Sequence, residues 1–140
     1  MCGAATDLTL YSLLNILPPL KLKGFMISTC CHHRCCSELY ANMDYLHKLG
    51  FDGTLINPLF NITSWGIYHE NPSDLHRETD IENIKYSKID KTKLGIQAKR
   101  ILDIGRVLFL IEKGYESFFI KYCDQSYSPE NFVIIGRTSV

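Results

Sequence analysis

A long helical segment followed by two strand-like runs constrains the fold of this 140-residue chain more than any other feature. Residues 92–113 carry apolar side chains at helical spacing, and Gly114 directly after them is a typical helix stop. Residues 115–122 and 131–136 are rich in aromatic and β-branched side chains and flank a polar turn region, which predicts a β-hairpin. A helix that leads into a hairpin favours a mixed α/β architecture over a helix bundle or a β-sandwich.

The helix predicted over 92–113 has one apolar face, which we expect to lie in the core. Gly105 interrupts it, and a glycine inside a helix costs roughly 1 kcal/mol relative to alanine, so we expect another segment to pack closely there. Arg106 either faces RNA or pairs with Asp103 on the helix surface, and we favour the pairing. The apolar positions are Leu94, Ala98, Ile101, Leu102, Leu108 and Ile111.

A first helix is predicted near the N-terminus. Thr6 is a favourable N-cap, and Asp7 complements the positive end of the helix. Leucines at helical spacing continue as far as Leu17, and Pro18-Pro19 stops the pattern. Because the start carries an early acid and lacks a basic region, we expect no secretory signal.

A strand and a second helix are predicted next. Residues 24–29 form a short apolar run that predicts a buried strand. The second helix is expected over 37–49 and is closed by Gly50, a residue type favoured just after helix ends. Its inward positions are Leu39, Met43 and Leu46.

Residues 52–91 are less regular than the rest of the chain. Prolines, glycines and many polar residues predict a long functional loop or insertion within a single domain over residues 1–140. The segment contains Trp65, the only tryptophan, which either stacks on a nucleic-acid base or packs partly buried; packing is the commoner outcome.

Residues 30–36, Cys-Cys-His-His-Arg-Cys-Cys, directly follow the predicted strand. Ligands bind beyond the carboxyl ends of strands in open α/β sheets, so the cluster lies at such an edge if the strand is an inner one. Four interpretations are open: a zinc site, a reactive cysteine, buried thiols with one histidine satisfying a backbone group, and a substrate site that uses imidazole and guanidinium groups.

The spacing weakens the first two interpretations. A structural zinc site usually takes two ligands from one close pair and two from another element, whereas Cys2 and Cys123 stand alone. A nucleophilic cysteine needs one thiol beside a base, and nothing selects one thiol among four. Buried thiols and a substrate site are therefore favoured.

Charge and hydropathy narrow the class of protein. Fifteen basic and fifteen acidic residues cancel, so no global positive charge indicates nucleic acid, although a local patch is compatible with RNA binding. The lysines at 85, 88, 91 and 93 with Lys99 and Arg100 are one candidate patch, and a solvated charged face is the alternative. No apolar run approaches the ~20 residues of a membrane helix, so we expect an intracellular, cytoplasmic or nuclear protein with reduced cysteines and no membrane contact.

Five short motifs, in the same order along the chain, resemble the eukaryotic tRNA 2′-O-methyltransferases that modify nucleotide four of the acceptor stem (the tRNA:m(4)X modification enzyme family). That family carries Cys-Gly-Ala-Ala-Thr-Asp-Leu followed by Cys-Cys-His-His-Arg-Cys. The similar segments here are Met1–Leu8, Cys30–Cys35, Ser64–Trp65, Leu102–Arg106 and Ser128–Asn131. They extend over essentially the whole chain.

The resemblance implies the C-terminal half of a Rossmann-like S-adenosylmethionine-dependent methyltransferase domain, ending in an antiparallel hairpin. It also implies that the glycine-rich half of the cofactor pocket and the zinc-binding modules of the family are not encoded here. S-adenosylmethionine is the implied cofactor and tRNA the implied partner. We therefore expect a truncated enzyme that is poorly active alone, with a non-catalytic RNA- or partner-binding remnant as the first alternative and a small zinc-binding interaction module as the second.

The resemblance assigns roles to six residues. His32 or His33 accepts the proton of the ribose hydroxyl or orients it, and Arg34 holds a neighbouring phosphate. Cys2, Gly3 and Asp7 face the cofactor, and no metal ligand is assigned. The alternatives are a backbone-capping histidine pair, a turn glycine and a helix-start carboxylate.

Overall fold

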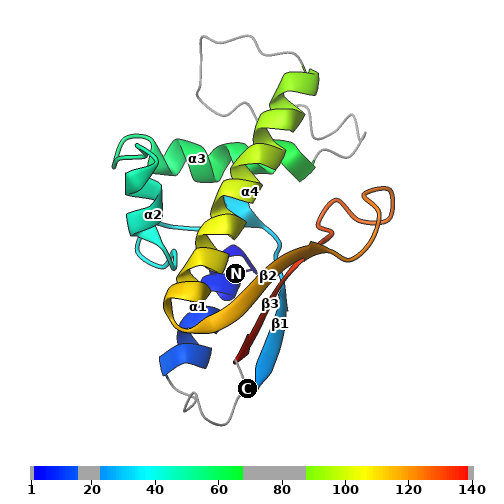
Figure 1. Ribbon diagram of the computed structural model, residues 1–140. Helices are drawn as coiled ribbons and strands as arrows, with labels where there is room; N and C mark the ends of the chain where they lie inside the picture. Colours follow the sequence, from blue (N-terminus) through cyan, green and yellow to red (C-terminus); the bar gives the residue numbers. More distant parts are fainter. Residues whose placement is uncertain (1, 16–22, 68–87, 139–140) are drawn as a thin grey trace.

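The computed structural model describes residues 2–15, 23–67 and 88–138, apart from the side chains of residues 2–4, 67, 88 and 89. Helices and strands are mixed along the described chain, as the sequence predicts (Figure 1). In order they are α1 (Cys2–Asn15), β1 (Gly24–Ser28), the 3₁₀ helix η1 (His32–Arg34), α2 (Met43–Lys48), α3 (Ile56–Ile62), the 3₁₀ helix η2 (Thr63–Ile67), α4 (Lys88–Glu112), β2 (Tyr115–Lys121) and β3 (Phe132–Thr138).

The described strands form a small sheet in the order β1–β3–β2, and β3 is antiparallel to both neighbours. The predicted C-terminal hairpin is confirmed, with Phe118 opposite Ile135 in its register. Because β1 and β2 both oppose β3, they run parallel to each other. The carboxyl ends of β1 and β2 therefore lie at the same end of the sheet, together with the start of β3.

The prediction of a buried inner strand over 24–29 is wrong. Strand β1 is an edge of the described sheet, and its side chains alternate between half-buried and exposed positions, with Met26 67% exposed. The physical reason is that a strand with helices on one face only buries every second side chain. Phe25 and Ile27 are the ones that pack inward.

The long helix is confirmed and extends from Lys88 to Glu112. Its buried positions include Ala98, Leu102 and Leu110, but Leu108 and Ile111, which we expected inside, are exposed. The helix touches η2 and α3 with its first half and the sheet with its second half, so its buried face is not one straight stripe. Among the described residues no helix combines the length and apolarity that a bilayer span requires.

The close packing expected at Gly105 is confirmed. A Cβ atom there would collide with the hydroxyl of Tyr40, which donates a 2.8 Å hydrogen bond to the Leu102 carbonyl of α4. Asn42 donates a second hydrogen bond, of 2.9 Å, to the carbonyl of Gly105 itself. The absence of a side chain at this position lets the segment before α2 lie directly on α4.

Two predicted helix starts are wrong. Helix α1 already begins at Cys2, so Thr6 and Asp7 lie inside it and are buried instead of capping it. Helix α2 begins at Met43, because Asn42 caps it by accepting a hydrogen bond from the Tyr45 amide; Leu39 precedes the helix and is 41% exposed.

The predicted helix ends at two glycines are confirmed. Gly50 and Gly114 have φ angles of 89° and 85°, which a residue with a side chain rarely adopts. The expected stop at Pro18-Pro19 lies outside the described residues.

The segment 52–91 is more ordered in its first part than the sequence indicates. Helices α3 and η2 occupy residues 56–67, and α4 begins at Lys88. Residues 68–87 lie outside the described part, so an insertion within a single domain stays a prediction.

Two apolar clusters hold these elements together. One lies between α2, α3 and the first half of α4 and includes Leu46, Phe60 and Leu102. The other lies between α1, the second half of α4 and the sheet and includes Leu110 and Ile134. Complete burial of a large apolar side chain stabilises the fold by roughly 1.5–3 kcal/mol. Two polar residues of the candidate site, Asp103 and Arg106, lie on α4 between these clusters.

Candidate functional site

The candidate site lies at the end of the sheet where the carboxyl ends of β1 and β2 meet. Thr29 and η1 follow β1, and Glu130 and Asn131 immediately precede β3. Cys31, between β1 and η1, has a φ of 50°, unusual for a residue with a side chain, and the chain turns sharply there. The Cys30–Cys36 cluster therefore does lie beyond a strand end, although β1 is not an inner strand.

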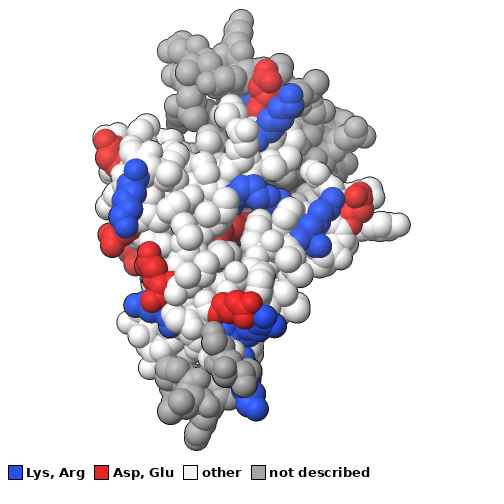
Figure 2. All heavy atoms as spheres, viewed as in Figure 1, with Lys and Arg blue, Asp and Glu red and all other residues white. Residues whose placement is uncertain are grey.

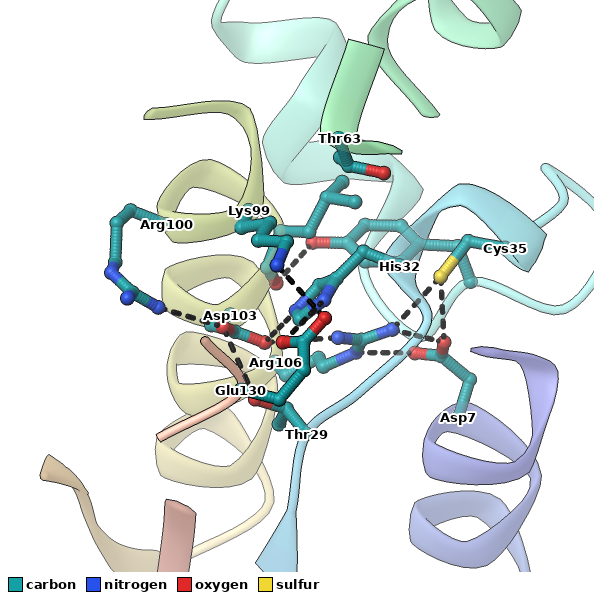
Figure 3. A network of polar contacts seen from close by, with 12 residues as sticks. Asp7, Thr29, His32, Cys35, Thr63, Lys99, Arg100, Asp103, Arg106 and Glu130 are labelled. Carbon is teal, nitrogen blue, oxygen red and sulfur yellow. Dashed lines mark hydrogen bonds and ion pairs between the residues drawn. The ribbon is translucent and has the colours of Figure 1, made fainter. Parts of the chain in front are cut away.

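Arg106 of α4 is the centre of a buried polar junction (Figure 3). Its Nε and Nη2 atoms donate to the two carboxylate oxygens of Asp7 of α1, at 3.0 and 2.6 Å, and Nη1 donates to Asp103 at 3.0 Å. Burial alone would lower the pKa of Arg106, but the charge and hydrogen bonds of Asp7 raise it well above its ordinary value. The pairing of Arg106 with Asp103 is thus present, but in the interior and not on the surface.

Asp103 connects this junction to the histidine cluster. Its Oδ1 atom lies 2.8 Å from Nε2 of His32, and its Oδ2 atom accepts a 3.3 Å hydrogen bond from the hydroxyl of Thr29. Burial would raise the pKa of the Asp103 carboxyl, but His32 and Arg106 outweigh it and hold that pKa below its usual range. Asp103 is therefore an ionised acceptor that fixes the orientation of the His32 ring.

His32 is 1% exposed and faces a second ion pair with its other nitrogen. Its Nδ1 atom lies 4.0 Å from Oε2 of Glu130, whose Oε1 accepts a 2.8 Å hydrogen bond from Nζ of Lys99. Figure 3 shows Glu130 and Lys99 meeting in front of the His32 ring. His32 is thus held between two carboxylates and is not open to solvent.

His33 and Arg34 lie on the outer side of the same short helix. His33 is half-buried and Arg34 is exposed, and the Nδ1 atom of His33 is itself buried and has no hydrogen-bond partner among the described residues. Burial, with the positive charge of Arg34, lowers the pKa of His33 below its ordinary value of 6.5. A neutral imidazole and an exposed guanidinium therefore stand next to each other at the rim of the site.

Cys35 belongs to the buried junction. Its Sγ atom lies 3.0 Å from Nη2 of Arg106 and 3.8 Å from Oδ2 of Asp7, and burial raises the pKa of the thiol to about 11. A thiol held so far from ionisation is a poor nucleophile. Across the described ranges, no three His, Cys, Asp or Glu side chains are grouped so that they could hold a metal ion.

The three residues expected to face a cofactor do not come together as a described site. Cys2 and Gly3 are in the first turn of α1, and their side-chain surroundings lie outside the described part. Asp7 is 2% exposed, and its oxygens bind Arg106 and the amide of Ala41 at 3.1 Å. An S-adenosylmethionine molecule would need free hydrogen-bonding groups here, and Asp7 does not fit that need.

The predicted basic run separates into different environments. Lys91 and Lys93 are exposed, Lys99 is buried against Glu130, and the side chains of residues 85 and 88 lie outside the described part. Figure 2 shows basic and acidic groups interspersed on the face in view, without one continuous basic patch. Trp65 is half-buried, with Nζ of Lys91 5.5 Å from its ring centroid, which favours packing over an open stacking platform.

Six participants were not assigned to the site from the sequence: Thr29, Cys35, Lys99, Asp103, Arg106 and Glu130. Lys99 and Asp103 are four residues apart, which places them on one face of a helix, and that spacing is a signal for their shared role. No local pattern joins either residue to Thr29 or Glu130, because these contacts depend on the fold of the sheet edge.

Comparison with known proteins finds relatives that carry the same enzyme name. A tRNA:m(4)X modification enzyme TRM13 of Kluyveromyces lactis is 30% identical over 148 residues, covering 97% of this chain and 34% of the relative. The Vanderwaltozyma polyspora protein of the same name is 33% identical over 151 residues, with 97% and 34% covered. A Dictyostelium discoideum homologue is 33% identical over 174 residues, with 98% and 33% covered.

This chain spans about a third of the length of these curated relatives. No solved structure matches it. A family model described as Methyltransferase TRM13 matches residues 1–137, a range that includes the junction, the histidine cluster and the hairpin. The chain therefore belongs to the Methyltransferase TRM13 family.

Proposed function

We propose that this chain is part of an intracellular tRNA 2′-O-methyltransferase that acts on nucleotide four of the acceptor stem. The names of its relatives as tRNA modification enzymes, and a family description as methyltransferase, support this assignment. The observation that carries it is the arrangement of η1: His32 is held by Asp103, while the half-buried His33 and the exposed Arg34 follow it where the strands end.

His33 is the proposed proton acceptor. A ribose 2′-hydroxyl is a weak nucleophile when neutral, so removal of its proton during attack accelerates transfer. The lowered pKa of His33 keeps its imidazole unprotonated near pH 7. Because its Nδ1 atom is buried, the other ring nitrogen is the one that we assign to the substrate. Arg34 then holds a phosphate of the same strand in a two-point contact.

His32 is assigned a positioning role. It is fully buried and bonded to Asp103, so it fixes the start of η1 and with it the direction of His33 and Arg34. Asp7 acts in the same indirect way through Arg106.

The fold supports half of a Rossmann-like domain. Strands β1 and β2 are parallel and are linked through α4, which is the crossover connection of α/β sheets, with the antiparallel β3 between them. S-adenosylmethionine, when bound, supplies an electrophilic methyl group. Because both carboxylate oxygens of Asp7 already bind Arg106, we assign contact from this chain to that cofactor to Cys2 and Gly3.

A hybrid protein tests the function. The chain replaces the segment that it matches in the Kluyveromyces lactis relative, and 2′-O-methylation of tRNA is measured by mass spectrometry of nuclease digests. We expect methyl groups at nucleotide four from the hybrid and none from the isolated chain. A folded hybrid that binds tRNA but never methylates it contradicts the proposal.

The occupied carboxylate of Asp7 favours one second candidate, a non-catalytic RNA-binding protein. The two functions differ in the hybrid: a remnant would give tRNA binding without methyl transfer. Labelled S-adenosylmethionine binding to the isolated chain tighter than millimolar would, conversely, show that a cofactor pocket is present.

A further inference from the structure

A hollow of about 240 Å³ lies between α4 and the hairpin, beside the candidate site. Its polar lining consists of three cationic side chains, Lys99, Arg100 and Lys121, and two amides, Gln125 and Asn131. Among the described residues that line it there is no carboxylate. We call this feature the basic hollow.

Arg100 is held rigidly at the wall of the basic hollow. Its guanidinium carbon lies 3.4 Å from the ring centroid of Phe132, and Nη1 lies 3.5 Å from Oδ2 of Asp103. Stacking on an aromatic ring fixes the guanidinium plane, and the single long ion-pair contact leaves most of its five N–H donors for a ligand. This preorganisation suits a planar fork onto an oxyanion.

The two lysines supply charge at different depths. Lys99 is 2% exposed and spends one hydrogen bond on Glu130, which leaves its ammonium with further donor capacity. Lys121 is 45% exposed, and its 3.4 Å contact with the exposed Asp124 is a weak, solvent-screened pair. The hollow therefore favours an anion, because it combines the buried cation of Lys99 with the exposed cation of Lys121.

The size of the hollow limits the class of anion. Pockets for whole small molecules usually begin at roughly 300 Å³, and the basic hollow is smaller. It fits one phosphate group with its water better than a complete nucleotide or a cofactor. Lys99 also belongs to the Glu130–His32 contacts, so a phosphate in the hollow would lie next to the histidine cluster.

We propose that the basic hollow binds one phosphodiester group of the RNA strand that the protein modifies. The identity of the ligand as RNA rests on the proposed function, whereas the preference for a phosphodiester rests on the lining. Lys99, Arg100 and Lys121 hold the backbone at a second point, separate from Arg34, and two fixed points on one strand define the position of the ribose between them.

Two titrations test the proposal with the whole 140-residue chain. In the first, dimethyl phosphate is added to ¹⁵N-labelled protein, and the side-chain signals of Arg100, Gln125 and Asn131 are followed. In the second, binding of a fluorescent acceptor-stem RNA is measured between 50 and 200 mM salt. The variants are Lys121→Ala and Arg100→Lys, with Lys48→Ala on α2 as a control that removes the same charge away from the hollow.

We expect dimethyl phosphate to shift the hollow signals, and Lys121→Ala to abolish the shifts. Lys121→Ala should weaken RNA binding roughly five- to tenfold and lower the slope of log affinity against log salt by about 0.9, whereas Lys48→Ala should not. Arg100→Lys retains the charge but loses the fork, so an intermediate loss is expected.

The outcomes separate this proposal from the proposed function. If RNA binds but Lys121→Ala and Lys48→Ala behave alike, the basic hollow is not a phosphate site and the proposed function stands. If dimethyl phosphate binds in the hollow but RNA does not bind the wild type, the hollow is an anion site and its assignment to RNA is wrong; methylation by the hybrid protein then decides the proposed function separately. If neither ligand shifts the hollow signals in a folded protein, the proposal is wrong.

Discussion

Two arginine–carboxylate forks in this protein have nearly the same geometry and opposite surroundings. Arg106 binds Asp7 through two hydrogen bonds of 3.0 and 2.6 Å, and Arg137 binds Glu116 through two of 2.6 and 2.8 Å. The first pair joins α1 to α4 with side chains 0% and 1% exposed; the second joins β3 to β2 with side chains 59% and 44% exposed.

The difference shows that burial, not fork geometry, decides what such a pair does. Charges removed from water need further partners, and the inner fork has them in Asp103, Cys35 and the Ala41 amide. The outer fork has water instead. Residues of the family-like motifs such as Asp7 and Arg106 therefore serve the architecture, and we propose that contact with a substrate falls to the half-buried His33 and the exposed Arg34.

The largest expected effect comes from breaking the inner fork. Arg106→Met leaves the carboxylates of Asp7 and Asp103 buried without their main cation, and we expect the free energy of unfolding to fall by about 3–5 kcal/mol. Urea unfolding followed by circular dichroism measures it. Arg137→Met is the matched control at the outer fork and should leave the unfolding midpoint nearly unchanged. Equal losses in the two variants would contradict the role given to burial.

A second, smaller effect is expected where the segment before α2 meets α4. Gly105→Ala places a methyl group against the Tyr40 hydroxyl and ring, and relief of that clash separates Tyr40 from Leu102; the expected cost is about 1–3 kcal/mol. Gly53→Ala is the control, because nothing lies within 4 Å of the added carbon. Thermal unfolding of both variants shows whether the segment before α2 packs on α4 as tightly as the contacts indicate. Similar melting temperatures for the two variants would argue against close packing at Gly105.

Acid should weaken the inner junction in a defined direction. The folded-state pKa of Asp103 is lowered below its ordinary value of 3.8, so its stabilising contribution is present above that pH and is lost as the pH falls through the folded-state pKa. Wild-type unfolding free energy should therefore decrease below pH 4 with an Asp103-dependent slope of at most about 1.4 kcal/mol per pH unit. Urea unfolding of the Asp103→Asn variant over the same pH range isolates the contribution of Asp103 to the slope. An unchanged slope in that variant would contradict the pairing of Asp103 with His32 and Arg106.

Local patterns in the sequence predict the long helix, the hairpin and the two glycine stops, because these depend on neighbours along the chain. The fate of Asp7 could not be predicted in this way. An acid one residue after a good N-cap favours a helix start, whereas the actual helix begins earlier and Asp7 meets Arg106 from 99 residues away. The exposure of β1 also depends on which faces of the sheet helices cover, and no residue within 24–28 encodes that.

The sequence predicts where the candidate site lies but not which of its side chains point inward. The Cys30–Cys36 cluster identifies the region, but its members divide by direction: His32 and Cys35 point inward to charged partners, and Arg34 points outward. That division follows from the turn at Cys31 and from contacts with Asp103 and Glu130, which are distant in sequence. Sequence spacing alone therefore could not separate the positioning histidine from the proposed reacting one.

The central claim is that His33 acts on the substrate, while His32 holds His33 in position. The most direct test is the rate of tRNA methylation by the hybrid protein carrying His33→Gln. We predict a loss of roughly 10²–10⁴ in kcat, with the melting temperature and the affinity for tRNA unchanged. Methylation at the wild-type rate in that variant would contradict the claim.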